Sequence, residues 1–195
     1  ADAQIIYGLG EITGVVGGEY ATVLCENGIV RASYVGSPLV FQIDAVETAR
    51  GCSLPGSVAN VGASVFYWSG DGFYLFDGQA SRPIGAEKVN RYFENDFNLA
   101  GKNRVSAAVD PLNQIYVIAY AGAQSGGRPN KLLIYNYALD RWSRAEVSTD
   151  LVAPMFTAGY TLDDLDAVSS VLDNLPASLD SPLWSGGEFV FAGGD

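Results

Sequence analysis

The sequence contains no histidine, only two cysteines, and no long uninterrupted run of apolar residues. Without histidine the chain lacks the commonest general base and metal ligand, so any catalysis would have to rely on carboxylates. The spacing of the two cysteines, Cys25 and Cys52, fits no zinc-binding pattern, and we expect both to be buried free thiols. No apolar run approaches the roughly 18–20 residues that span a bilayer, so we expect no membrane-spanning segment.

Basic residues are scarce as well. Lysine and arginine number 11 against 22 aspartates and glutamates, which gives a formal net charge of −11 at pH 7. A protein that grips nucleic acid needs clustered positive charge, so this composition argues against such a role. An acidic surface is still compatible with a protein past which nucleic acid must move without sticking.

The residues that are abundant indicate a folded, mainly β chain. Hydrophobic residues make up 48% and aromatic residues 12% of the 195 positions, and there are 23 glycines. A chain of this length can bury a sizeable core. Short runs rich in Val, Ile, Tyr, Phe and Thr, separated by glycine-containing turns, are typical of antiparallel strands.

One predicted hairpin is apolar on both faces. The stretch VFYWSGDGFYLFDG, residues 65–78, has a continuous apolar run on either side of its Gly-Asp-Gly centre. A hairpin with one face in water would alternate apolar and polar residues along each strand. Because this one does not alternate, we expect both of its faces to be covered.

The same hairpin pattern occurs earlier in the chain. Residues 18–30 align with residues 62–74 at a spacing of 44 residues, and the alignment places glycines of the first stretch on glycines of the second. Each stretch carries a dipeptide that suits a two-residue type I′ turn, in which both central residues need positive φ. The predicted turn residues are Asn27, Gly28, Asp71 and Gly72.

A third copy follows, with strands predicted at 113–120 and 131–137. The glycine-rich stretch AGAQSGGRPN joins them and lengthens the turn. Its exposed tip is either a mobile loop or a loop that contacts a partner, and its lone arginine stands out in so acidic a chain. The tip residues are Gln124, Ser125, Gly126, Gly127 and Arg128.

A repeat of 40–50 residues that carries several short strands per unit is typical of a β-propeller. We therefore predict a mainly β fold with about three propeller-like blades over residues 1–160. In a propeller the blades stack face to face, which would cover both faces of the 65–78 hairpin. The alternative is an ordinary β-sandwich in which the 44-residue spacing arises by chance.

The remaining segments are predicted to be connectors and a chain end. Apolar residues at helical spacing predict short helices at 86–93 and at 161–168, the second within an acidic connector that covers residues 161–187. Residues 188–195 are predicted to start a further strand whose partner lies outside this chain. Since the first residue is Ala1 and not methionine, we expect the chain to be a fragment of a larger protein.

No catalytic, cofactor-binding or metal-binding residue is assigned. The stretch GLGEITG, residues 8–14, has the wrong glycine spacing for a dinucleotide site and is predicted to be a turn. The acidic residues Asp163, Asp164, Asp166, Asp173 and Asp180 lack the alternation and the glycine of a calcium loop. A glycosidase-type carboxylate pair would need no histidine. However, Asp71, Asp77 and Asp140 occupy turn positions where Asp is favoured for local hydrogen bonding.

Several stretches resemble a family of virion structural proteins of tailed bacteriophages. They are GVVGGEY, YVGSPLVFQIDAVETARGCSLPGSVANVG, DGFYLFDGQASRPIGAEKVNRYF, VSAAVDPLNQ, PNKLLIYNYALDRWS and GYTLDDLDAVSSVLDNLPASLDSPLWSGG. The resemblance covers roughly residues 12–190. It implies a propeller-like domain similar to that of the tail nozzle, or tail tubular protein, of short-tailed phages.

The resemblance also implies a role and a location. Copies of the chain would form a ring of six at the distal end of the tail, in contact with other tail or adaptor proteins. DNA would pass through this ring during ejection without specific binding. The protein would be assembled in the cytoplasm of the infected bacterium and would reside in the virion. The alternatives are a head–tail connector, fibre-attachment or capsid decoration protein, or a carbohydrate-active propeller that binds or cleaves host surface glycan.

Overall fold

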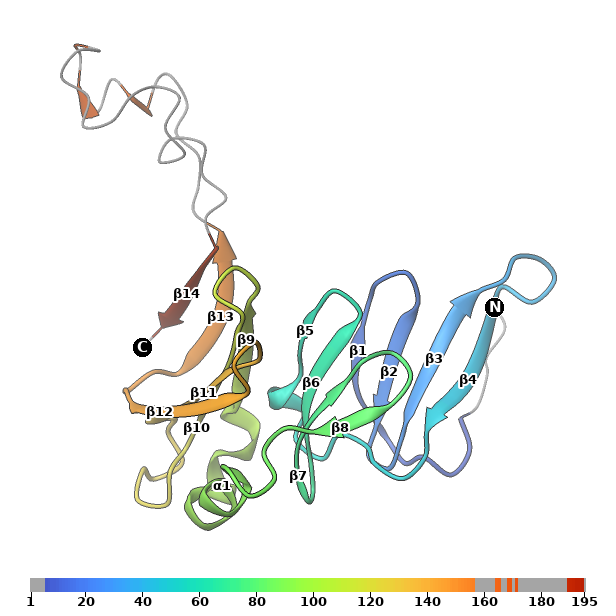
Figure 1. The fold of residues 1–195 in the computed structure, drawn as a ribbon, viewed down its shortest axis with the longest axis horizontal. Helices are drawn as coiled ribbons and strands as arrows, with labels where there is room; N and C mark the ends of the chain where they lie inside the picture. Colours follow the sequence, from blue (N-terminus) through green and yellow to red (C-terminus); the bar gives the residue numbers. More distant parts are fainter. Residues whose placement is uncertain (1–5, 157–163, 166–167, 170, 172–188, 195) are drawn as a thin grey trace.

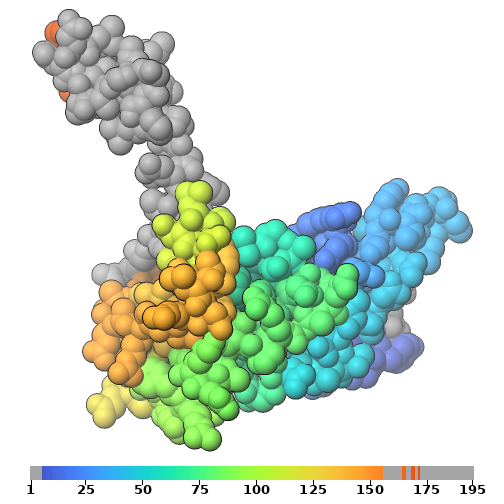
Figure 2. Space-filling view, viewed as in Figure 1, coloured from blue at the N-terminus to red at the C-terminus, as the bar shows by residue number. Residues whose placement is uncertain are grey.

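The computed structural model describes residues 6–156, 164–165, 168–169, 171 and 189–194. The fold is mainly β, as the composition predicts, and consists of antiparallel sheets that lie side by side in a row (Figure 1). The order of the sheets along the row follows their order in the chain, and the space-filling view shows the same progression of colours from one end to the other (Figure 2).

Three of the sheets are four-stranded meanders in which each strand pairs with the next along the chain. Sheet 1 consists of β1 (Ile12–Val16), β2 (Ala21–Cys25), β3 (Ile29–Tyr34) and β4 (Phe41–Glu47). Sheet 2 consists of β5 (Ala59–Val61), β6 (Ser64–Ser69), β7 (Gly72–Phe76) and β8 (Ser81–Pro83). Sheet 3 consists of β9 (Ser106–Asp110), β10 (Ile115–Tyr120), β11 (Lys131–Asn136) and β12 (Arg141–Glu146).

The 44-residue repeat is preserved in the strand register. Val23 of β2 lies opposite Val30 of β3, and Tyr67 of β6 lies opposite Tyr74 of β7, 44 residues further along in each case. The inner hairpins of sheets 1 and 2 are therefore equivalent in register as well as in sequence. The third predicted copy corresponds to the β10–β11 hairpin of sheet 3.

A two-stranded sheet follows sheet 3. Its strands, β13 (Leu151–Phe156) and β14 (Phe189–Gly194), run antiparallel, with Leu151 opposite Gly194. The prediction that the last strand has its partner outside this chain is therefore wrong. Short-range periodicity cannot show such a partner, because the two strands are far apart in the sequence.

Sheet 2 is covered on both of its faces. The face that points toward sheet 1, which we call its leading face, packs against Leu24 and Ile29. The opposite face, which we call its trailing face, packs against residues of sheet 3 that include Tyr116 and Tyr135. The leading face consists of Val65, Tyr67, Tyr74 and Phe76, and the trailing face of Phe66, Trp68, Phe73 and Leu75. This arrangement explains the absence of alternation in residues 65–78.

The connectors contain short helices. The helix α1 (Asn90–Asp96) begins four residues later than the predicted helix at 86–93, and Val89 and Phe93 are buried as the helical spacing predicts. Two 3-10 helices were not predicted, η1 (Pro55–Ser57) and η2 (Leu99–Arg104). Most of the predicted helix at 161–168 lies outside the described residues. Among the described residues, no helix is long and apolar enough to cross a membrane.

The helix η1 joins two sheets through one buried residue, Ser57. Its hydroxyl donates a hydrogen bond to the carbonyl of Leu54 at 2.6 Å and accepts one from the backbone N–H of Trp68 in sheet 2 at 2.8 Å. Its backbone carbonyl accepts a hydrogen bond from the hydroxyl of Tyr116 in sheet 3 at 2.8 Å. Both cysteines are buried free thiols, as predicted, and burial raises the pKa of each.

Candidate functional site

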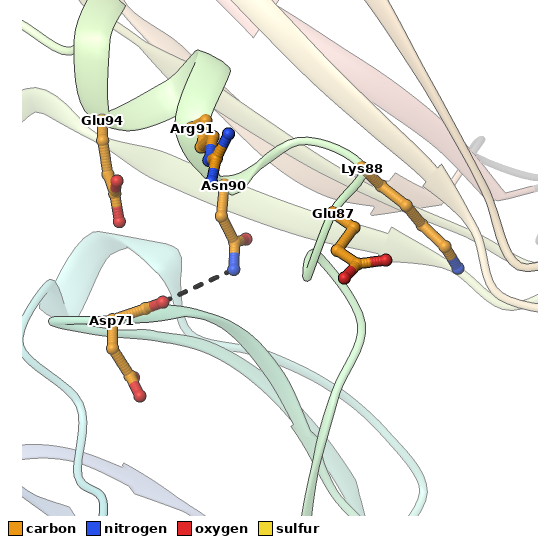
Figure 3. Close-up of a pocket in the computed structure, with 6 residues that line it drawn as sticks. All are labelled: Asp71, Glu87, Lys88, Asn90, Arg91 and Glu94. Carbon is orange, nitrogen blue, oxygen red and sulfur yellow. Dashed lines mark hydrogen bonds between the residues drawn. The ribbon is translucent and has the colours of Figure 1, made fainter.

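A charged cavity opens beside the β6–β7 turn, where sheet 2 meets the start of α1 (Figure 3). Its volume is about 570 Å³. It is lined by Asp71, Glu87, Lys88, Asn90, Arg91 and Glu94. These side chains come from a hairpin turn and from the segment that leads into the helix, so two separate connections of the chain form this cavity.

The Asn90 side chain holds the β6–β7 turn against the start of α1 through two hydrogen bonds. Its side-chain carbonyl accepts a hydrogen bond from the backbone N–H of Phe73 at 3.2 Å, and its amide nitrogen donates one to the backbone carbonyl of Asp71 at 3.4 Å. A Cβ atom at Gly72 would collide with the Asn90 side chain. Gly72 is therefore needed for the close approach of these two segments.

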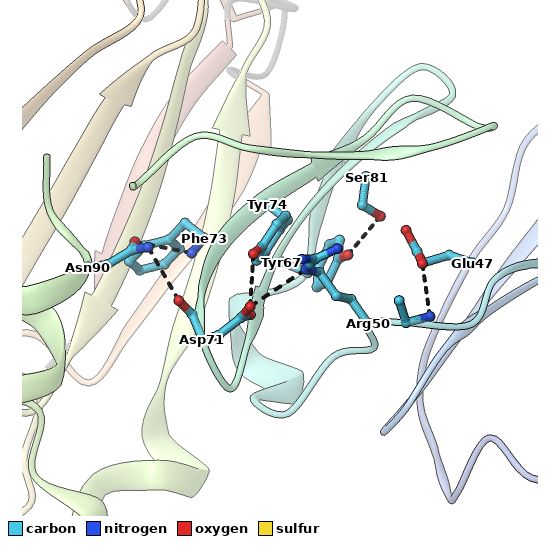
Figure 4. A network of polar contacts seen from close by, with 9 residues as sticks. Glu47, Arg50, Tyr67, Asp71, Phe73, Tyr74, Ser81 and Asn90 are labelled. Carbon is cyan, nitrogen blue, oxygen red and sulfur yellow. Dashed lines mark hydrogen bonds and ion pairs between the residues drawn. The ribbon is translucent and has the colours of Figure 1, made fainter. Parts of the chain in front are cut away.

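The Asp71 carboxylate belongs to a polar network at the same turn (Figure 4). It accepts a hydrogen bond from the Tyr74 hydroxyl at 3.0 Å, and it forms an ion pair with Arg50 Nε at 3.6 Å. The Arg50 guanidinium lies over the Tyr74 ring, 5.0 Å from its centroid. Burial, followed by the hydrogen bond to Asp71, raises the pKa of Tyr74. Asp71 thus holds the connector between sheets 1 and 2 against sheet 2.

No carboxyl group with a raised pKa is seen among the shifted carboxylates of the described residues. The pKa is lowered at Asp77, Asp96, Asp110 and Asp140, whereas a glycosidase general acid needs a carboxyl group with a raised pKa. These four residues lie outside the cavity. None of the six cavity residues is aromatic. Within the described part of the chain, no group of three or more Cys, Asp or Glu residues could hold a metal ion.

A second network joins α1 to sheet 3. Lys131 Nζ lies 2.8 Å from Asp96 Oδ1, and the Tyr120 hydroxyl donates a hydrogen bond to Asp96 Oδ2 at 2.8 Å. Burial would raise the pKa of Asp96, but the contacts with Lys131 and Tyr120 outweigh it, and the pKa lies below its ordinary value. The hydrogen bond to Asp96 raises the pKa of Lys131 accordingly.

Asp96 is expected to make stability depend on pH. A carboxyl whose pKa is lowered by folding contributes stability above its unfolded pKa, about 3.9, and loses it as the pH falls through the folded value. We expect Asp96→Asn to lower the free energy of unfolding by about 1.5–3 kcal/mol at neutral pH. The difference from wild type should shrink below about pH 5. Urea unfolding at a series of pH values measures this.

The matched control for Asp96→Asn is Glu19→Gln, which removes the same charge at an exposed position. It should leave the free energy of unfolding nearly unchanged at every pH, because exposed charges contribute little. A difference between Asp96→Asn and wild type that stays constant down to about pH 2 would contradict the ion-pair account.

Two further ion pairs tie connectors to sheet 3. Lys88 Nζ lies 2.6 Å from Asp140 Oδ2, and Asp140 Oδ1 accepts a hydrogen bond from the Tyr135 hydroxyl at 2.9 Å. Arg128 Nη2 lies 3.0 Å from Asp150 Oδ2. Each of these connectors is thus held to a neighbouring sheet by an ion pair, and several charged residues serve this structural purpose.

The predicted turn residues lie at the tips of the predicted hairpins, but the turns are not of type I′. Asn27 and Gly28 belong to the longer β2–β3 loop, and neither has a positive φ. In the β6–β7 hairpin Ser69 lies opposite Gly72, so the two-residue turn consists of Gly70 and Asp71. Neither of these two residues has a positive φ. The predicted turn type is therefore wrong at both hairpins.

The tip residues 124–128 form a folded loop that lies against η2, since a Cβ atom at Gly127 would lie 3.4 Å from Ala100. The backbone N–H of Ser125 donates a hydrogen bond to the Gly122 carbonyl at 3.0 Å, and Gly126 and Gly127 adopt φ values of 64° and 89° that favour glycine. The Arg128 guanidinium pairs with both carboxylate oxygens of Asp150. The loop is thus held at its end, and contact of Gln124 or its neighbours with a partner stays a prediction.

The other sequence candidates are turns or lie outside the described residues. Residues 8–11 form a turn in which Gly8 and Gly10 have positive φ, and the strand β1 follows it. The Asp77 carboxylate accepts hydrogen bonds from the backbone N–H groups of Gln79 and Ala80, both at 2.9 Å. Of the predicted acidic stretch, Asp163, Asp166, Asp173 and Asp180 lie outside the described residues.

Sequence analysis missed one surface, the face of sheet 1 that points away from sheet 2. Ile12, Val15, Tyr34 and Phe41 are exposed on it. The alternation within β4, FQIDAVE, indicates one apolar face of that strand. It could not show that Ile12, Val15 and Tyr34 on this face are exposed among the described residues, because exposure depends on the packing of whole sheets.

Comparison with known proteins does not assign the chain to a family. No family model matches the chain, and a search of curated proteins finds no significant match.

Proposed function

We propose that this protein is a non-enzymatic structural component of a tailed-phage virion, a propeller-like part of the tail nozzle that acts by assembling into a ring. The observation that carries the proposal is the series of three four-stranded antiparallel meanders that pack face to face in chain order. A meander of four strands is the usual blade of a propeller. The stretches that resemble phage virion proteins supply the virion setting.

The arrangement of the first strands supports the propeller interpretation. The first strand of sheet 2, β5, contacts β9, the first strand of sheet 3, and β9 contacts β13, the first strand of the two-stranded sheet. Val152 of β13 donates a backbone hydrogen bond to the Ser106 hydroxyl of β9 at 2.9 Å. In a propeller the innermost strands of successive blades are neighbours around the axis. In sheets 2 and 3 the first strand thus contacts the first strand of the sheet that follows.

The use of charged residues favours an assembly role over catalysis. Four ion pairs, which involve Arg50, Lys88, Arg128 and Lys131, hold connectors against sheets. The acidic balance of the chain suits a conduit, because carboxylates repel DNA phosphates and leave no site at which DNA would stall. A head–tail connector, a fibre-attachment protein or a capsid decoration protein are the alternatives within the virion.

Electron microscopy of intact phage particles labelled with an antibody against this chain tests the proposal. We expect the label at the tip of the tail, on a part of the particle with ring symmetry. Label on the capsid or on fibres would overturn the nozzle assignment and favour one of the virion alternatives. A purified chain that binds or cleaves host surface glycan, with no label on any particle, would favour the carbohydrate-active propeller.

A further inference from the structure

Another cavity opens between sheets 1 and 2, at the edge of the row where the β1–β2 and β5–β6 turns lie next to each other (Figure 1). Its volume is about 430 Å³, which is in the range of pockets that hold small ligands. It is lined by residues 16–20 and 22 of the first hairpin and by residues 60, 62 and 63 of the second. Residues 60–63 are the 44-residue counterparts of residues 16–19, so equivalent turns of two successive sheets form this cavity.

The Thr22 side chain indicates that the cavity is a binding site. Thr22 lies in β2 and is only 3% exposed. Its hydroxyl forms no hydrogen bond with any residue that the structure describes. A buried hydroxyl without a partner costs free energy, and buried polar side chains are nearly always hydrogen-bonded. Because Thr22 lines the cavity, a molecule bound there would form the hydrogen bond that the protein does not supply.

Two glycines of the β1–β2 turn leave the cavity free of side chains. Neither Gly17 nor Gly18 has a positive φ, so the backbone conformation does not require glycine at either position. A Cβ atom at Gly17 would meet no heavy atom within 4 Å other than those of its chain neighbours. One at Gly18 would meet only the Tyr20 carbonyl oxygen, at 3.6 Å. Neither the turn nor the packing of the protein therefore accounts for these two glycines, whereas an occupant of the cavity does.

The Tyr20 side chain forms a wall of the cavity and is held in place by both sheets. The Arg31 guanidinium of sheet 1 lies over the Tyr20 ring, 5.5 Å from its centroid. The Tyr20 hydroxyl reaches the β7–β8 turn of sheet 2, where a Cβ atom at Gly78 would collide with it. A ring fixed in this way loses little conformational freedom when a ligand packs against it.

Two further polar groups of the lining are available to a ligand. Glu19 is exposed, and its carboxylate has no ion pair or hydrogen bond with another described residue. The Asn60 amide nitrogen donates a long hydrogen bond, 3.5 Å, to the Gly62 carbonyl, which leaves the amide oxygen to accept from a ligand. With the Thr22 hydroxyl, the cavity thus offers a hydroxyl, a carboxylate and an amide beside an aromatic ring.

We propose that this cavity binds one unit of a neutral saccharide. A sugar ring carries hydroxyl groups that both donate and accept hydrogen bonds, together with apolar C–H groups. It therefore matches a lining in which Thr22, Glu19 and Asn60 lie beside Tyr20. An acidic sugar is disfavoured, because Glu19 and the net charge of −11 would repel it.

The cavity is suited to holding a glycan and not to cleaving it. Hydrolysis of a glycosidic bond ordinarily needs two carboxyl groups, and Glu19 is the only one among the lining residues. Saccharide binding is a function beyond assembly, and it does not rest on the proposed ring, because the cavity lies between two sheets of a single copy.

Saturation-transfer difference NMR on the purified chain tests the proposal, with glucose, galactose, N-acetylglucosamine and glucuronic acid as probes. We expect at least one of the three neutral sugars to bind with a dissociation constant of about 1 mM, and glucuronic acid to bind at least about tenfold more weakly. No signal from any neutral sugar at millimolar concentration would overturn the proposal. Glucuronic acid that binds as tightly as the neutral sugars would overturn it as well.

Two variants locate the bound sugar. Thr22→Val keeps the shape of the side chain and removes the hydroxyl, so the dissociation constant should rise about tenfold, as expected for one lost hydrogen bond. The urea midpoint of unfolding should stay the same or rise, since that hydroxyl has no partner among the described residues. Gly17→Leu places a side chain at the cavity and should abolish binding, and near-ultraviolet circular dichroism reports whether it is folded.

The matched control is Thr13→Val in the neighbouring strand β1. The Thr13 hydroxyl donates a hydrogen bond to the Leu24 carbonyl at 3.2 Å, so this variant should lower the urea midpoint and leave sugar binding unchanged. Sugar binding that both Thr22→Val and Gly17→Leu retain would overturn the assignment of the cavity. The location of the antibody label on phage particles is independent of these results, so failure of the inference and failure of the proposed function can be told apart.

Discussion

Replacing Phe93 with alanine is expected to lower the free energy of unfolding by about 3–5 kcal/mol. Phe93 lies in α1 and is 1% exposed. Its ring contacts those of Trp68, Phe73, Phe97 and Tyr120, with centroids 4.6–5.1 Å away. The alanine variant loses the packing of a whole aromatic ring between sheets 2 and 3 and leaves a cavity there. Denaturant unfolding followed by tryptophan fluorescence measures the effect.

The local helix propensity cannot account for the expected loss. Alanine favours a helix more than phenylalanine does, so α1 itself should be stabilised by the change. Leu139→Ala is the control, because this leucine is exposed in the β11–β12 turn and should change the free energy of unfolding by no more than about 0.5 kcal/mol. A loss below about 1 kcal/mol for Phe93→Ala would mean that the core does not depend on this ring.

Replacing Gly56 with alanine is expected to lower the free energy of unfolding by about 1–3 kcal/mol. A Cβ atom at this position would collide with the backbone carbonyl of Val105, which cannot rotate away as a side chain can. The collision should push η1 away from the start of sheet 3 and weaken the hydrogen bond from Tyr116 to Ser57. Thermal and denaturant unfolding measure the loss.

Two further variants test that explanation. Gly17→Ala is the matched control, because an alanine Cβ there would meet no heavy atom within 4 Å other than those of its chain neighbours. This control should leave stability unchanged or slightly raised. If the hydrogen bond to Ser57 is weakened by Gly56→Ala, then Tyr116→Phe should cost less in that background than in wild type. Additive effects of Gly56→Ala and Tyr116→Phe would argue against the proposed displacement of η1.

The sheets and their inner hairpins could be predicted because their signal is local. The hairpin at 65–78 and its counterpart at 18–30 show continuous apolar strands around a turn, and the structure contains both as β6–β7 and β2–β3. The lack of alternation in 65–78 correctly indicated burial on both faces. That prediction needs only the two-residue period of a strand, which the sequence displays directly.

The turn types could not be predicted, because the glycines are needed for reasons that lie elsewhere in the fold. A Cβ atom at Gly28 would lie 2.7 Å from the backbone carbonyl oxygen of Glu47, a residue in β4. Gly72 makes room for Asn90 in α1. In both cases the glycine allows close approach of a distant segment, whereas local reasoning attributed it to positive φ.

The polar contacts that hold the connectors and α1 against sheet 3 also could not be predicted from the sequence. Lys131 pairs with Asp96, and the indole nitrogen of Trp142 donates a hydrogen bond to the Ile84 carbonyl at 2.8 Å. These partners lie in different sheets and connectors, and no periodicity links them. Only the packing of sheets 2 and 3 brings such groups within reach of each other.

The match between the order of the sheets in space and their order in the chain has a consequence for synthesis on the ribosome. Domains and their parts tend to fold from the N-terminus as they emerge. When β5–β8 leaves the ribosome, the surface of sheet 1 that it covers is already present, and the same holds for sheet 3 after sheet 2. The leading face of sheet 2 can therefore be buried as soon as it forms, without waiting for a distant part of the chain.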